Sequence, residues 1–251
     1  MVEQQRFTGR VAIVTGAGSG IGRATAIRLG SEGAAVGCLD LDGGAAAETA
    51  ATINAAGRAI GVACNVSDQE SGRAAVTQVV EAFGPPTLLC NIAGVGRFAH
   101  SHEMPVADWQ RIIDVNLTGT FLMCQAVLPH LLVNGGSIVN TASNAGLMGQ
   151  AYSAAYCASK GGVVMLTKAL SNEYVKAGVR VNAVAPGGTD TPIQRSFDLP
   201  EGADPKFLYK IMSPMGMATP AEVASLFAYV ASDEARYMTG SIVSMDGGLS
   251  S

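Results

Sequence analysis

Short apolar runs alternate with longer helix-like segments along most of this 251-residue chain. The runs are rich in β-branched residues and end at glycine, asparagine or aspartate, which is typical of buried parallel strands. The segments between them repeat apolar residues at helical spacing, and several stop at glycine. This alternation predicts an α/β fold in a single domain: a doubly wound (Rossmann) parallel sheet with helices on both faces.

Seven strands and six main helices are expected, followed by one long irregular segment. The predicted strands are Val11–Thr15, Ala35–Asp40, Ala59–Val66, Leu88–Asn91, Ser137–Thr141, Val179–Ala185 and Ser241–Met245. The predicted helices are Ile21–Glu32, Gly44–Ala56, Asp68–Phe83, Pro105–Leu132, Tyr152–Lys176 and Pro220–Ala231. Residues 186–218 show no regular pattern, and such a long loop in a compact domain is usually functional. We expect a substrate lid there, with short helices around Pro205–Met212.

Composition and the chain ends exclude several classes of protein. Only 14% of the residues are charged and the net charge is −4, so the basic surface that binds nucleic acid is missing. Residues 1–8 lack a signal-peptide core, and no apolar run reaches the roughly 18 residues of a membrane span, so we expect a cytoplasmic protein without a membrane partner. The five cysteines and three histidines lack metal-ligand spacing, and no metal site is expected.

A glycine-rich turn, Thr15–Gly22, joins the first predicted strand to the first helix. Glycines at such a turn let a pyrophosphate approach backbone N–H groups at the positive end of a helix. Asp40 ends the next strand, where a carboxylate binds ribose hydroxyls and repels a 2′-phosphate. No Arg or Lys lies between Arg28 and Arg58 to neutralise that phosphate. The pattern favours NAD over NADP. For the glycine motif itself, the alternative is a tight strand–helix turn that binds no ligand.

Three side chains have the spacing of an acid–base site. Tyr156 and Lys160 are four residues apart and so share one helix face. A cation beside a phenol favours the phenolate and lowers its pKa, which suits a general acid/base. Ser143 follows the strand Ser137–Thr141 at the carboxyl edge of the sheet, where its hydroxyl can donate to a substrate oxygen. Tyr152 has no cation four residues on, so we interpret it as pocket wall or core.

Together these motifs resemble the classical short-chain dehydrogenase/reductase family from Arg10 to Gly248. The resemblance implies that Asn116 completes the catalytic set with Ser143, Tyr156 and Lys160 by holding a water that connects the lysine to solvent. It implies NAD(H) as the cofactor, with Lys160 on the nicotinamide ribose. The cofactor-binding residues it implies are Gly16, Ser19, Gly20, Ile21, Gly22, Asp40, Leu41, Asn65, Val66, Asn91, Ala93, Gly94, Tyr156, Lys160, Pro186, Gly187, Thr189 and Thr191.

Two positions depart from the family pattern. Ile92 stands where the family has the second asparagine of Asn-Asn-Ala-Gly, and Asn65 stands where aspartate is usual. The first asparagine of that motif is the structural one, and an asparagine can still accept from the adenine amino group. We therefore expect both changes to be tolerated.

The predicted reaction is reversible hydride transfer between a secondary alcohol, or its ketone, and NAD. Tyr156 takes or gives the hydroxyl proton, Ser143 orients the oxygen, and Lys160 keeps the phenolate accessible. The alternatives are an NADP-preferring ketone or 3-oxoacyl reductase and a non-catalytic dinucleotide-binding sensor. A methyltransferase on a similar sheet would also use glycines and an acidic strand end, but it would not need Ser143, Tyr156 and Lys160 in this register.

The lid composition bears on the substrate. Its apolar residues are Ile193, Phe197, Leu199, Phe207, Leu208, Tyr209, Ile211, Met212, Met215 and Met217. Flexible methionines suit an irregular apolar pocket, so we expect a mainly apolar alicyclic or aromatic alcohol or ketone. Packing of the lid onto the body is the alternative for any one of them. Met148, Gln150 and Arg97 could border the pocket, and Arg195 and Lys206 could meet an acidic substrate group.

The helical segments 109–132 and 156–170 are apolar on more than one face. A helix that is apolar all round must be covered on all sides. In the family the two corresponding helices pair between subunits. We therefore expect a homotetramer.

Overall fold

The predicted strands form one parallel sheet in the computed structural model, which describes residues 5–55 and 57–250, without the side chain of Leu208. The strands are β1 (Val11–Thr15), β2 (Ala35–Asp40), β3 (Arg58–Ala63), β4 (Leu88–Asn91), β5 (Gly136–Thr141), β6 (Val179–Pro186) and β7 (Ile242–Met245). Their order across the sheet is β3-β2-β1-β4-β5-β6-β7, and every neighbouring pair is parallel. The order reverses between β1 and β4, where open α/β sheets form a ligand crevice at their carboxyl edge. The predicted doubly wound fold is confirmed.

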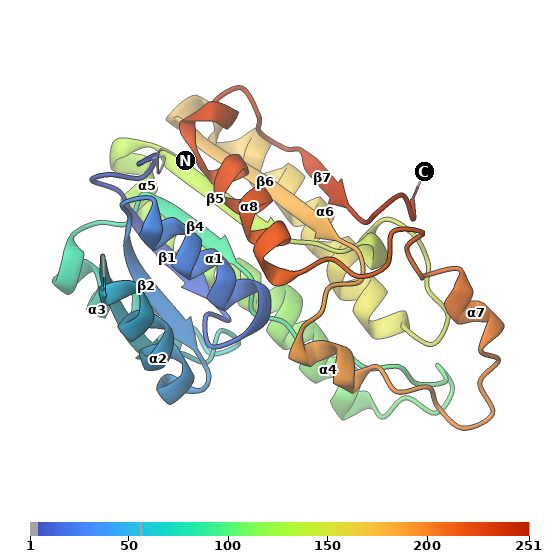
Figure 1. Cartoon of the computed structure of the whole chain (residues 1–251). Helices are drawn as coiled ribbons and strands as arrows, with labels where there is room; N and C mark the ends of the chain where they lie inside the picture. The colour runs from blue at the N-terminus through green and yellow to red at the C-terminus, as the bar shows by residue number, and fades with distance from the viewer. Residues whose placement is uncertain (1–4, 56, 251) are drawn as a thin grey trace.

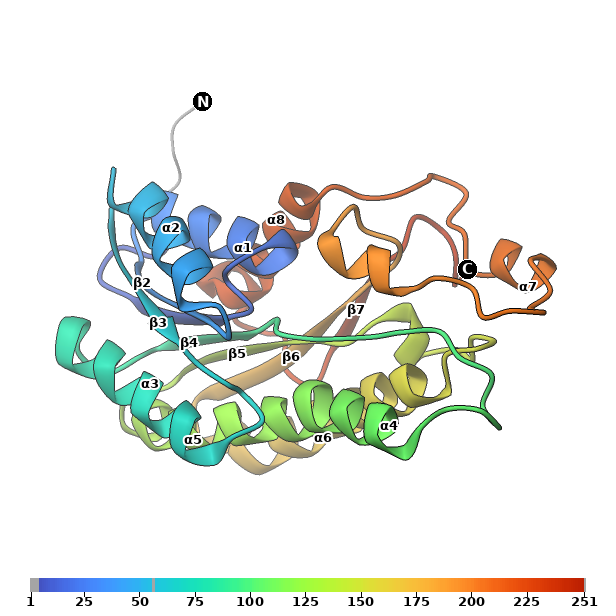
Figure 2. The ribbon, with the colours of Figure 1, turned by 90° about the horizontal axis from the view of Figure 1, so that it is seen from below.

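Helices cover both faces of the sheet (Figure 1 and Figure 2). One face carries α1 (Gly20–Ser31), α2 (Gly43–Asn54) and α8 (Pro220–Ala231), and the other carries α3 (Gln69–Phe83), α4 (Val106–Ile113), α5 (Gly119–Asn134) and α6 (Ala154–Tyr174). Successive strand residues point to opposite faces. Along β1, Ala12 and Val14 belong to the core under α1 and α8, whereas Val11 and Ile13 belong to the core under α3 and α5. Apolar residues at every position of β1 therefore build two cores.

Asn116 lies in a π-helical turn, Asp114–Thr118, which separates α4 from α5. The sequence predicts one regular helix over 105–132, because a π turn inserts a residue without changing the apolar pattern noticeably. The extra residue accompanies a buried Asn116 that bonds both backbone groups of Val95, as described below. Insertions of this kind are frequent at functional sites.

Other boundaries differ from the prediction for local reasons. Helix α6 begins at Ala154 because Tyr152 has a left-handed φ of 63° and Ser153 is the N-cap. Strand β3 ends at Ala63 because the Asn65 side chain accepts from Ser67 N and turns the chain. The predicted end of the second helix, Ala56, lies outside the described residues.

The segment 186–218 is tied to the body at its base and carries short helical turns. Thr189 and Ala218 form an isolated parallel bridge. Between them lie a 3₁₀ turn, Pro192–Ser196, and the short helix α7 (Lys206–Tyr209), which confirms helical structure near 205–212. Helix α7 projects from one end of the molecule (Figure 1).

The continuous helical stretch Val106–Asn134 is long and apolar enough to cross a membrane by length and composition alone. This membrane-span signal was not predicted from the sequence, because the stretch contains no long uninterrupted apolar run. The indication is weak, because the core helix of a soluble protein passes the same test. Its Met123, Cys124, Val127 and Leu131 are buried in the core against the sheet.

Candidate active site

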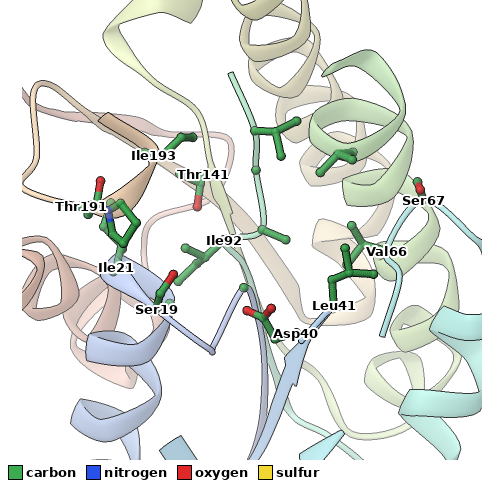
Figure 3. Close-up of a pocket in the computed structure, with 18 of the residues that line it drawn as sticks. Ser19, Ile21, Asp40, Leu41, Val66, Ser67, Ile92, Thr141, Thr191 and Ile193 are labelled. Carbon is green, nitrogen blue, oxygen red and sulfur yellow. The ribbon is translucent and has the colours of Figure 1, made fainter. Parts of the chain in front are cut away.

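Two adjoining cavities open at the carboxyl edge of the sheet. The first, of about 490 Å³, lies over the ends of β1, β2 and β4 (Figure 3). The second, of about 370 Å³, lies between β5, β6 and the segment 186–218. Five residues line both cavities: Ile21, Thr141, Tyr156, Thr191 and Ile193. Tyr156 therefore stands on the boundary between them.

The first cavity is shaped by backbone that no side chain could replace. Gly16 has φ +66°, and a Cβ there would lie 2.9 Å from Ala93 Cα. A Cβ at Gly22 would lie 2.0 Å from the Gly16 carbonyl oxygen. Thr15 Oγ1 accepts from the backbone N–H groups of Ile92 and Ala93, at 2.9 and 3.1 Å. The turn after β1 is thereby joined to the loop after β4, and both present backbone to the cavity, as a dinucleotide pyrophosphate requires.

Asp40 lines this cavity at the end of β2, beside the exposed Leu41 (Figure 3). Its Oδ2 accepts from Gly18 N at 2.8 Å, and its Oδ1 accepts from Asp42 N at 3.0 Å. These bonds hold the carboxylate in place at the glycine turn. Arg111 of α4 lines the same cavity. This cation was not predicted from the sequence, because Arg111 lies far from Asp40 in the chain.

Burial dominates the electrostatics of Tyr156 and Lys160. It raises the pKa of Tyr156 to about 12, and a hydrogen bond with Ser143 acts in the opposite direction. Burial also lowers the pKa of Lys160 to about 8. Lys160 Nζ donates to the Thr141 carbonyl at 2.8 Å and lies 5.7 Å from the centroid of the Tyr156 ring. The expected lowering of the pKa of Tyr156 by the lysine is not found, because desolvation of the phenolate is the larger effect.

Ser143 lies on the second cavity, at the start of a 3₁₀ turn after β5. Its Oγ donates to Asn144 Oδ1 at 3.1 Å and accepts from Ala145 N at 3.2 Å. The turn therefore fixes the hydroxyl on the side of Tyr156 that faces the second cavity. A hydroxyl held there can orient and polarise a substrate oxygen.

Asn116 lies behind the cavities and lines neither of them. Its Nδ2 donates to the Val95 carbonyl at 2.8 Å and to Ser159 Oγ at 3.0 Å, while its Oδ1 accepts from Val95 N at 2.8 Å. The side chain is fully buried. It thus clamps the loop after β4 to α6, the helix that carries Tyr156 and Lys160.

All the other residues expected at the site line one of the two cavities, except Asn91. Asn91 is buried within the sheet, where its Nδ2 donates to Asn140 Oδ1 at 2.9 Å, so it supports the loop from behind. Residues that the sequence argument missed include Ser67, Ile92, Val95, Arg111, Val115, Phe98, Asn144 and Ser213. Three of them carried a signal, because Ile92 lies within the Asn91–Gly94 motif and Val95 and Phe98 follow it into the same crevice.

The segment 186–218 contributes part of its apolar set to the second cavity: Ile193, Phe197, Ile211, Met212 and Met217. Leu199, Phe207, Tyr209 and Met215 do not line it, and the Leu208 side chain lies outside the description. Gln150 lines the cavity but Met148 does not. Arg195, Lys206 and Arg97 are also absent from its lining, and Arg97 pairs instead with Asp108.

Tyr152 belongs to the support of the lid. Its hydroxyl accepts from Asp204 N at 2.9 Å, and its ring packs edge-on against His100 at 5.2 Å and against Phe207 at 6.2 Å. His100 Nε2 lies 2.9 Å from the Glu201 carbonyl oxygen. Tyr152 is half-buried and lines neither cavity, so it differs from the expected pocket wall or core.

Comparison with known proteins agrees with this architecture. Residues 16–250 match a family model described as enoyl-(acyl carrier protein) reductase. The chain is 42% identical to cis-4-hydroxycyclohexanecarboxylate dehydrogenase of Sinomonas cyclohexanicum, over 97% of this chain and 98% of that protein. A short-chain type dehydrogenase/reductase from Mycobacterium marinum superposes with a TM-score of 0.90 at 32% identity, over 99% and 98% of the two chains. The 3-ketoacyl-(acyl-carrier-protein) reductase of Brucella melitensis complexed with NADH gives 0.90 at 34%, over 98% and 100%.

Proposed function

The chain belongs to the short-chain dehydrogenase/reductase family, and we propose that it is an NAD(H)-dependent oxidoreductase of mainly apolar alicyclic or aromatic secondary alcohols and their ketones. Family membership makes it an oxidoreductase acting on alcohols or ketones. The observation that carries the proposal is the position of Tyr156. It stands where the two cavities meet, with Lys160 on one side and Ser143 on the other.

The first cavity fits a nicotinamide dinucleotide. Gly16 and Gly22 allow backbone segments to pack closely where a Cβ would collide with them, and the first turn of α1 lines the cavity. Asp40 and Leu41 lie where the adenosine ribose would bind, and Lys160 lies where the nicotinamide ribose would bind. When bound, the nicotinamide supplies the acceptor or donor of a hydride.

The Asp40 carboxylate supports NAD over NADP. It is fixed by Gly18 N and Asp42 N at the edge of the cavity, where a 2′-phosphate would meet its negative charge. Arg111 lines the same cavity and favours the second candidate, an NADP-preferring ketone or 3-oxoacyl reductase. The negative charge of Asp40 would repel a 2′-phosphate at close range. Arg111 belongs to a different element, α4, so we give more weight to Asp40 and place NAD first.

In the proposed reaction, the residues of this chain transfer a proton to and from the oxygen of the substrate. Ser143 Oγ holds the substrate oxygen and polarises it as charge develops. Tyr156 takes the hydroxyl proton during oxidation and returns it during reduction. Lys160, whose Nζ lies 5.7 Å from the Tyr156 ring centroid, would stabilise the phenolate when it is protonated, against the larger effect of burial. Asn116 keeps the loop after β4 and helix α6 in register, so that these groups converge.

The substrate proposal is supported by the lining of the second cavity and by one relative. Phe98, Phe197, Ile211, Met212 and Met217 make its surface largely apolar. The relative at 42% identity is named for a hydroxylated cyclohexanecarboxylate, which supports a ring-shaped substrate but carries a charge that the lining of this cavity does not match. The structural neighbour named 3-ketoacyl-(acyl-carrier-protein) reductase keeps the acyl alternative open to test.

We also propose a homotetramer. Phe121, Leu132 and Val133 of α5 and Met165 of α6 are large apolar side chains that remain exposed in the single chain. Burial of such a surface against a second copy stabilises an oligomer. The cytoplasmic location stays a prediction of the sequence.

The direct test is a screen of NADH formation from secondary alcohols, run in parallel with NADP. The panel contains cyclohexanols, 1-arylethanols, linear 2-alkanols and a 3-hydroxyacyl thioester. We expect the ring alcohols with NAD to give the highest kcat/KM. Preference for NADP or for the thioester would favour the second candidate, and binding of NADH without turnover of any alcohol would favour a sensor.

A further inference from the structure

The wall of the second cavity beside Tyr156 is aromatic. The Phe197 ring from the lid packs edge-on against Tyr156, with centroids 5.4 Å apart at 79°, and against Phe98, with centroids 4.9 Å apart at 64°. Both are geometries that aromatic pairs favour. Phe98 is buried, so the lid ring rests on a fixed surface. A substrate whose reacting carbon lies at the Tyr156 hydroxyl therefore has an aromatic edge beside it.

The Phe197 ring occupies space that exists because residue 96 is glycine. A Cβ at Gly96 would lie 2.3 Å from Phe197 Cζ and 3.0 Å from Tyr156 Cδ2. The loop cannot readily move away, because Asn116 bonds both backbone groups of Val95. Any side chain at position 96 must therefore displace the Phe197 ring.

The lining of this cavity is free of charged side chains within residues 5–55 and 57–250. Its polar side chains are hydroxyls and amides, among them Ser143, Asn144, Gln150 and Gln194. Gln150 Nε2 donates to Asn144 Oδ1 at 3.1 Å, so Gln150 Oε1 is left as an acceptor. An ionised substrate group buried there would lose its hydration without gaining an opposite charge. An uncharged polar group would find amide partners.

We infer that the cavity selects an uncharged, ring-shaped secondary alcohol or ketone, and that Gly96 and Phe197 are the residues that decide the preference for a ring. This inference rests on the function proposed above and deepens it. Phe197 supplies the surface for one face or edge of the ring. The amides of Gln150 and Gln194 receive an uncharged polar substituent.

Three probe ketones separate charge from shape. They are 4-oxocyclohexanecarboxamide, the isosteric 4-oxocyclohexanecarboxylate, and the open-chain 5-oxohexanamide. With NADH as reductant, we expect kcat/KM for the cyclic amide to exceed each of the others by about tenfold or more. Equal or faster reduction of the carboxylate would overturn the charge part of the inference, and equal reduction of the open-chain amide would overturn the ring part.

The pair of residues is tested by substitution. Gly96→Ala should lower kcat/KM for the cyclic amide by about tenfold and leave the open-chain amide nearly unchanged. Phe197→Leu should cause a similar loss on the cyclic amide, and Gly96→Ala/Phe197→Leu should lose little more than either single variant, because both changes remove the same aromatic surface. Gly149→Ala is the matched control, since a Cβ there meets nothing within 4 Å. Equal losses on both ketones, or a loss in the Gly149→Ala control, would contradict the assignment.

A binding measurement distinguishes failure of this inference from failure of the proposed function. The Tyr156→Phe protein keeps the ring that packs against Phe197 and loses only the hydroxyl. Calorimetric titration of its NADH complex should show the cyclic amide binding about tenfold more tightly than the carboxylate. If the wild type reduces no probe yet this binding order holds, the proposed function fails and the inference stands. If the order is reversed or absent, the inference fails.

Discussion

The two cavities that meet at Tyr156 are built in different ways. The first is made of backbone at the ends of β1, β2 and β4, with Gly16 and Gly22 placed where a Cβ would collide with other backbone. The second is covered by side chains of an irregular segment, held by isolated contacts such as Tyr152 with Asp204 and Ser213 with Gly247. Backbone surfaces suit a ligand that is constant across a family, whereas side chains on a loop can vary with the substrate.

Loss of the shared residue gives the largest expected effect. Tyr156→Phe should lower kcat by about 10²–10⁴-fold, because the proton donor is lost while the ring and its packing remain. NADH affinity, measured by fluorescence titration, should stay unchanged. A normal turnover rate in this variant would remove Tyr156 from the mechanism, and loss of NADH binding would show that the two cavities are not separable.

Lys160 makes the boundary between the cavities sensitive to pH. Its pKa of about 8 lies below the ordinary 10.5, so the unfolded chain holds more protons than the folded one between these values. Lys160 alone should therefore raise stability with pH across that window, by up to about 1.4 kcal/mol per pH unit. The raised pKa of Tyr156 opposes this above pH 10, and four buried thiols, whose pKa values burial raises from 9.0 to about 11 or 12, oppose it from about pH 9. The contribution of Lys160 is isolated by urea unfolding of wild type and Lys160→Met at pH 7.5 and 9.5, where the difference in stability between the two proteins should change in favour of the wild type as the pH rises.

Adding one methyl group to a glycine of each cavity tests whether the first cavity tolerates a side chain less well than the second. Gly22→Ala places a Cβ 2.0 Å from a backbone oxygen and should lower the free energy of unfolding by about 1–3 kcal/mol, with weaker NADH binding. Gly188→Ala lies on the substrate cavity, where the nearest atom is the flexible Met217 Cγ at 3.7 Å. It should change stability by less than about 0.5 kcal/mol. Equal effects on urea unfolding would refute the contrast.

Cofactor choice belongs to the first cavity alone. Asp40→Asn keeps an acceptor for Gly18 N but removes the charge, so the ratio of kcat/KM for NAD over NADP should fall by about tenfold. Substrate preference at saturating cofactor should stay the same. An unchanged ratio would exclude the carboxylate as the determinant, and Arg111→Ala would be the next variant to measure.

The smallest effect is expected at the lid support. Tyr152→Phe removes the acceptor for Asp204 N, which is worth about 1 kcal/mol, so KM should rise a few-fold at constant kcat. Amide exchange at Asp204 should become faster. An unchanged exchange rate would show that Phe207 and His100 hold the lid without this bond.

Local sequence patterns were sufficient for the sheet, for the glycine turn and for most of the residues lining the first cavity. They failed where a residue reaches the site from a distant element. Arg111 enters the first cavity from α4, and Phe98 meets Phe197 across about a hundred residues of chain. The π turn around Asn116 also left no trace in the apolar pattern. Asn116 and Asn91 lie behind the cavities, where Asn116 Nδ2 donates to the Val95 carbonyl and Asn91 Nδ2 donates to Asn140 Oδ1.

By itself the sequence determined the fold and the family and pointed to Ser143, Tyr156 and Lys160 as candidate catalytic residues, because apolar periodicity and short motifs depend on neighbours in the chain. The tertiary structure decided three other things: which residues of the segment 186–218 line the second cavity, that none of the described residues lining that cavity is charged, and that burial rather than Lys160 has the larger effect on the pKa of Tyr156. These depend on contacts between remote segments and on exclusion of water, which are properties of the packed molecule.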